Sequence, residues 1–64
     1  MSLYDFSRSL ELKKNDEPFY ALIMAAMLRA DDYNTAKLKT LYPDIYKEVF
    51  DRYNAPGGVL PGDN

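Results

Sequence analysis

The stretch FYALIMAAMLRA, residues 19–30, decides the fold of this chain. Its first ten residues are all apolar or aromatic, in a sequence of 64 residues that is otherwise largely polar. Ten residues of helix span roughly 15 Å, which is about half the thickness of a bilayer's hydrocarbon core. The stretch is therefore too short to cross a membrane, and we interpret it as a helix within a folded domain.

Apolar residues occupy more than one side of this helix, which we place at about residues 17–30 with residues 15–18 as its start. One side has the spacing of a buried face and consists of Phe19, Leu22, Ile23, Ala26, Met27 and Ala30. The other side is normally charged in a surface helix, but here it consists of Ala21, Met24, Ala25 and Leu28. The helix therefore needs cover on two sides, which makes it the central element of the fold.

Two further helices are predicted after it, at about 33–42 and 43–54. Their apolar residues continue in one helical phase from Leu38 to Tyr53, which allows either a break at Pro43 or one kinked helix. We favour the break, because proline disfavours helical geometry in the residue before it and Pro43-Asp44 is a good helix opening. Glu48 and Arg52 form a favourable pair on the last helix.

The first fifteen residues and the last ten are less regular in pattern. Ser2 and Asp5 resemble a capping box, and Leu3, Phe6 and Leu10 keep helical spacing, which predicts a short amino-terminal helix. The alternation of residues 10–13 also fits a strand, but no other segment offers that strand a partner. Residues 55–64 contain Pro and Gly repeatedly and are predicted to form an irregular tail.

These elements predict one all-α domain over residues 1–64, a three-helix bundle with a short amino-terminal helix. Its parts are an amino-terminal segment at 1–15, a helical core at 16–54 and the tail at 55–64. The first side of helix 17–30 is expected to pack on the later helices, at Leu38, Leu41, Ile45, Val49 and Phe50. Its second side is expected to be covered by Leu3, Phe6 and Leu10, or by another chain.

The composition disfavours catalysis, because the chain has no histidine and no cysteine. It lacks the side chain best suited to proton transfer near neutral pH, and none of its hydroxyl groups has an evident activating base. We expect no enzyme activity, no catalytic residue and no cofactor or cofactor-binding residue. The carboxylates of Asp31 and Asp32 could in principle bind calcium, but the glycine and the late glutamate of a calcium-binding loop are missing. Helix capping explains these two residues better, so we expect no metal site.

Protein binding is the function that the composition favours. A chain of 64 residues without disulfide or metal gains stability most readily from a partner, either another protein or a second copy in a homodimer. Its six tyrosines are too many for so small a core, and tyrosine is enriched at interfaces. The candidate interface consists of Ala21, Met24, Ala25, Leu28, Tyr20, Tyr46 and Tyr53.

Nucleic-acid binding is the alternative, through a helix-turn-helix unit that uses Lys37 and Lys39. The formal net charge of −2 argues against it, because binding to phosphates normally requires a basic face. The start of the chain lacks the basic and apolar regions of a signal peptide, and no segment is long enough to anchor it in a membrane. We therefore expect a cytoplasmic protein.

Three segments carry a resemblance to known proteins: FYALIMAAMLRADDYN, LYPDIYKEVFDRYNAPGG and VLPGD. Together they resemble small uncharacterised helical proteins encoded by bacteriophages and mobile elements. The resemblance covers roughly residues 19–62 and rests on the order of helices and turns. It implies a bacterial host cell as the setting and a non-enzymatic accessory role, with no functional residue to carry over.

Overall fold

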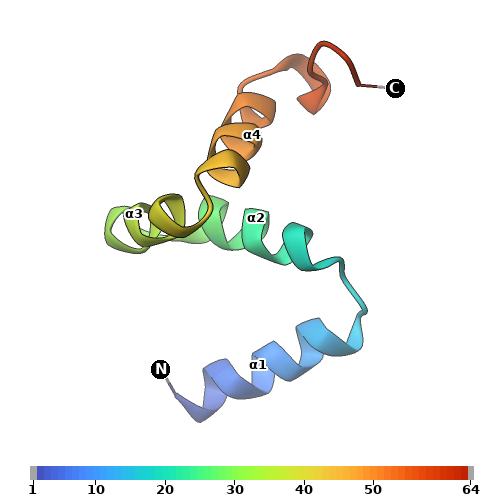
Figure 1. Ribbon diagram of the computed structural model, residues 1–64. Helices are drawn as coiled ribbons and strands as arrows, with labels where there is room; N and C mark the ends of the chain where they lie inside the picture. The colour runs from blue at the N-terminus through green and yellow to red at the C-terminus, as the bar shows by residue number, and fades with distance from the viewer. Residues whose placement is uncertain (1, 64) are drawn as a thin grey trace.

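The computed structural model describes residues 2–63, so Met1 and Asn64 at the ends of the predicted domain lie outside the described residues. The described chain consists of α1 (Leu3–Lys14), α2 (Phe19–Arg29), α3 (Asp32–Leu41), α4 (Pro43–Tyr53) and the short 3-10 helix η1 (Pro56–Gly58) (Figure 1). The predicted all-α class is confirmed for these residues. The strand alternative for residues 10–13 is wrong, because they lie inside α1.

Helix α1 begins and ends as its sequence dictates. The Ser2 hydroxyl accepts a hydrogen bond from the Asp5 backbone N–H at 3.1 Å, which confirms Ser2 as the cap of α1. The Asp5 carboxylate accepts from the Ser2 hydroxyl at 3.0 Å and not from its backbone N–H, so the second bond of a capping box is replaced. At the other end the Asp16 N–H donates to the Lys13 carbonyl, and Asp16 has a left-handed φ of 56°. Aspartate tolerates that conformation better than most residues, so α1 ends there.

The start of α2 differs from the prediction. Residues 15–17 do not cap it, because the residue at its cap position is Pro18, which has an extended backbone and makes no side-chain capping bond. Asn15 and Asp16 instead complete the end of α1 through backbone bonds to Glu11 and Lys13. The linker of residues 15–18 is thus a left-handed turn followed by an extended segment.

The later boundaries agree with the sequence. The Asp31 carboxylate accepts the Asn34 N–H at 2.8 Å and so caps α3, as predicted. Tyr42 lies outside helical geometry, with φ −132° and ψ 62°, and Pro43 is the first residue of α4. The predicted break at Pro43 is therefore confirmed, because the proline restricts Tyr42 and itself fits the first turn.

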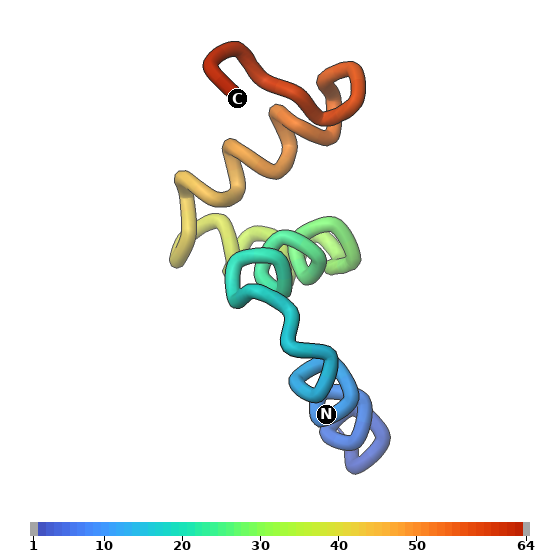
Figure 2. The backbone as a smooth tube through the Cα atoms, turned by 90° about the vertical axis from the view of Figure 1, so that its right-hand side faces the viewer, coloured from blue at the N-terminus to red at the C-terminus, as the bar shows by residue number. Residues whose placement is uncertain are grey.

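Helices α2, α3 and α4 contact one another, whereas α1 contacts none of them (Figures 1 and 2). Among residues 2–63 only Met27 of α2 and Val49 of α4 are buried hydrophobic residues, with exposed fractions of 1% and 5%. So small a core does not confirm the predicted bundle. Leu41 was expected in the core but is 71% exposed, because α3 ends there and the chain turns into α4.

The tail, predicted to be irregular, contains one short turn of 3-10 helix and otherwise no helix or strand over residues 55–63. Residues Pro56–Gly58 form η1, which contacts α4. Gly57 and Gly58 have left-handed φ values of 63° and 70°, which glycine adopts without strain. The chain therefore folds back toward α4 after its last turn. No helix within residues 2–63 combines the length and apolar character that a membrane span requires.

Candidate interaction surface

Helix α1 presents an unpartnered apolar face. Leu3, Phe6 and Leu10 follow one another at helical spacing on one side of it and are 78%, 59% and 50% exposed. The expectation that they cover α2 within the same chain is wrong for this structure, because α1 contacts no other helix. An amphipathic helix gains most of its stability by burying such a face, and α1 does not bury this face within its own chain.

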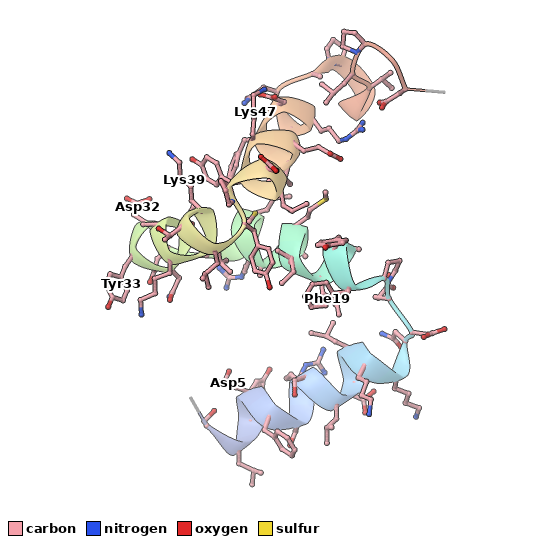
Figure 3. The ribbon with its side chains drawn as sticks, in the orientation of Figure 1. Asp5, Phe19, Asp32, Tyr33, Lys39 and Lys47 are labelled. Carbon is pink, nitrogen blue, oxygen red and sulfur yellow. The ribbon has the colours of Figure 1, made fainter. Side chains whose placement is uncertain are left out.

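The second side of α2 is also open. Ala21, Ala25 and Leu28 are exposed and lie at helical spacing, while Met24 is half-buried at the edge of this side. The reason is the position of Met27, which turns the opposite side of α2 toward α4. Figure 3 shows Phe19 on the lower side of α2, turned toward α1. Phe19 is not part of the open side, because it lies across the helix from Ala21, Ala25 and Leu28.

The three tyrosines of the predicted interface do not gather at this side. Tyr20 is exposed at the start of α2, where it lines a hollow of about 240 Å³ with residues that include Tyr42 and Ile45. Tyr46 is half-buried on α4, with its ring 4.8 Å from that of Phe50. Tyr53 is exposed near the end of α4. The structure thus joins Ala21, Ala25 and Leu28 into one surface and leaves Tyr46 and Tyr53 on another helix.

The two lysines of the nucleic-acid alternative lie on different sides of α3. The Lys37 ammonium is 4.2 Å from the centre of the Tyr33 ring, and the Lys39 ammonium is 4.9 Å from the centre of the Tyr46 ring. Both are cation–π contacts, which hold each charge over an aromatic ring of its own chain. Figure 3 shows Tyr33 and Lys39 pointing away from α3 in opposite directions. The lysines therefore do not form one basic face.

A polar clamp joins the tail to α4, and the sequence pattern did not predict it. The Arg52 guanidinium donates to both Asp63 carboxylate oxygens, at 2.6 and 2.8 Å, and to the Gly58 carbonyl at 2.9 Å. It also donates to Glu48 at 3.1 Å, which is the predicted pair on α4. The contact between Arg52 and Asp63 depends on the path of the chain through η1, so spacing alone does not reveal it.

The clamp changes the acidity of its members. The hydrogen bonds from Arg52, with that from the Leu60 backbone N–H, hold the pKa of Asp63 well below its ordinary value of 3.8. Hydrogen bonds to Asp63 and then to Glu48 raise the pKa of Arg52, which remains a cation throughout. Because the pKa of Asp63 is lower in the folded tail than in the unfolded chain, the Asp63 carboxylate stabilises the folded tail at any pH above its unfolded pKa. This stabilisation is lost as the pH falls from the unfolded pKa to the folded one.

We therefore expect the tail to detach from α4 in acid. As the pH falls from about 4 toward the lowered pKa of Asp63, the Leu60 amide should progressively lose protection against hydrogen exchange, because Asp63 becomes protonated and releases Arg52 and the Leu60 N–H. The measurement is exchange or amide chemical shift by NMR as a function of pH. In an Asp63→Asn variant this amide should be less protected already at pH 7 and should no longer respond to acid. An unchanged Leu60 amide in that variant would contradict the clamp.

A second hollow on the described part of the chain is lined mostly by charged residues. This shallow hollow of about 270 Å³ beside α4 is lined by Asp44, Lys47, Glu48, Asp51 and Leu60. Its charges are partly paired, since Lys47 lies 2.6 Å from Asp51 and Arg52 lies 3.1 Å from Glu48. Within residues 2–63 no group of three or more acidic side chains is close enough to hold a metal ion. Comparison of the chain with known protein families, curated proteins and solved structures finds no match.

Proposed function

We propose that this protein is a small non-enzymatic helical module that acts by binding a protein through α1 and the open side of α2. The observation that carries the proposal is that the apolar face of α1 and the open side of α2 are both exposed and uncovered within the chain. Exposed apolar surface of this kind marks interaction sites in stable proteins. The absence of histidine and cysteine from the sequence supports a role without catalysis.

The resemblance to small phage and mobile-element proteins supports an accessory role in a bacterial host cell. Such a role requires a binding surface and no catalytic site, which agrees with the composition of the chain. The three-helix arrangement of α2, α3 and α4 serves in this proposal as the scaffold that presents the open side of α2. Regulation of nucleic acid has less support, because Lys37 and Lys39 lie over separate aromatic rings and the formal net charge is −2.

Site-specific photo-cross-linking in cells tests this function. With the photoreactive residue benzoylphenylalanine at Ala25, we expect covalent adducts of defined mass, because Ala25 is the middle residue of the exposed side of α2. The control carries the same residue at Ala36, an exposed alanine on α3 that lies outside the proposed surface. Adducts at Ala25 and few at Ala36 support the proposal, whether the captured protein is a second copy or a different chain. No adduct at Ala25 would contradict it.

A further inference from the structure

The chain exposes far more surface than a folded monomer of its mass. Its accessible area is 5617 Å², whereas a 7.4 kDa monomer is expected to expose roughly 4,200 Å². Its radius of gyration is 13.4 Å, against an expected value of about 11 Å for 64 residues. The excess is roughly 1,400 Å². Figure 2 shows α1 standing apart from the other helices, which leaves α1 and the side of α2 that it could cover exposed.

That excess has the size of a stable dimer interface. If a second copy covers it on both chains, the interface totals about 2,800 Å², which lies in the range of obligate homodimers and well above that of crystal contacts. Such a dimer also removes the instability of a core that consists of Met27 and Val49. The area thus favours a second copy of the chain over a short peptide as the occupant.

The two apolar faces match each other when the helices run antiparallel. Leu3, Phe6 and Leu10 are separated by three and four residues, and so are Leu28, Ala25 and Ala21 when α2 is followed backwards. Because both helices rise about 1.5 Å per residue, Leu3 comes level with Leu28, Phe6 with Ala25, and Leu10 with Ala21. Phe6 and Leu10 then meet alanines of α2, which allows close packing, while Leu3 meets Leu28.

The charges beside these faces agree with the same register. Lys14, near the end of α1, comes level with Glu17, just before α2. These two charges are opposite, and antiparallel helix dipoles also attract each other.

The linker directs α1 toward a partner chain. Pro18 is extended, with φ −58° and ψ 143°, and the preceding residue is restricted by it. With Asp16 in the left-handed conformation, the linker holds α1 away from the α2 of its own chain. A short, restricted linker of this kind favours exchange of an element between identical chains.

We propose that two copies of this chain form a symmetric dimer in which α1 of each copy packs antiparallel on the open side of α2 of the other. This proposal rests on the protein-binding function above and names a second copy as the bound protein. In each of the two contacts, Phe6 of one copy lies against Ala25 of its partner. The four helices of both contacts form the core that the single chain lacks.

Sedimentation of complementary variants tests the contact. We expect the wild type to sediment at twice 7.4 kDa, and Phe6→Lys and Ala25→Asp alone to dimerise about 100-fold or more weaker. Mixed in equal amounts, the two variants should form a heterodimer, because it contains one intact contact and one that pairs the new lysine with the new aspartate. Circular dichroism checks that each variant keeps its helices, and formation of the heterodimer shows that both can bind.

Three results would overturn the proposal: a wild type of 7.4 kDa at every concentration, a single variant that dimerises as tightly as the wild type, or a mixture no tighter than its components. The cross-linking experiment separates this failure from failure of the proposed function. A monomeric wild type that still captures a different protein through Ala25 disproves the dimer and leaves the binding function in place. A monomer that captures nothing disproves both.

Discussion

Replacing Met27 with alanine is expected to remove most of the stability of this protein. Met27 is 1% exposed and, with Val49, forms the buried core at the contact of α2 with α4. Truncating a buried methionine to alanine typically costs about 2–5 kcal/mol, from lost burial and from the cavity left behind. A domain of this size rarely has more than about 3–5 kcal/mol to lose. Urea unfolding followed by circular dichroism should show a transition near zero denaturant, or none.

Leu41→Ala is the matched control for this experiment. It also truncates a large apolar side chain on a helix, but Leu41 is 71% exposed, so the free energy of unfolding should change by no more than about 0.5 kcal/mol. Equal losses in the two variants would show that the core does not lie between α2 and α4. A stable Met27→Ala variant would show that the fold depends on a different set of contacts.

Phe6→Ala is expected to have the second large effect, on self-association. In the single chain Phe6 is exposed, so its truncation removes no contact with another helix and should leave an isolated monomer unchanged. In the proposed dimer Phe6 is the largest apolar side chain of the contact and occurs twice. A loss of about 2 kcal/mol at each copy weakens the dimer by roughly a thousandfold. Sedimentation equilibrium over a range of concentrations measures this change directly.

Tyr4→Ala provides the control on the same helix. Tyr4 is also an aromatic residue and is 67% exposed, but it lies to one side of the face formed by Leu3, Phe6 and Leu10. Its truncation should alter the dissociation constant far less. If both variants dimerise equally well, the face of α1 takes no part in the interface. If both are equally weak, the contact is wider than the proposed register allows.

Local signals in the sequence predicted the secondary structure well. The capping bonds of Ser2 and Asp31 and the break before Pro43 depend on residues within one turn of each other, so spacing alone reveals them. The start of α2 was placed wrongly, because Asn15 and Asp16 fit the beginning of one helix as well as the end of another. Only the backbone path shows that they end α1.

Contacts between distant segments were harder to predict. The clamp between Arg52 and Asp63 depends on the turn of η1, and the exposure of Leu41 depends on how α3 meets α4. The surplus of apolar surface on α2 was evident from Ala21, Ala25 and Leu28, since a one-sided helix does not need them. Their spacing alone does not show what covers them. The sequence was therefore compatible with two covering elements, α1 of the same chain and another molecule.

The contact between Phe6 and Ala25 lies at the centre of the proposed dimer, and isotope-filtered NMR tests it most directly. In an equal mixture of labelled and unlabelled wild-type chains, the filter retains only nuclear Overhauser effects between different molecules. For the proposed dimer we expect a filtered signal between the Phe6 ring of one chain and the Ala25 methyl group of another. A signal between these groups only within one chain would show that α1 folds back onto its own α2. No signal between them at any concentration would show that the open side of α2 is not covered by α1.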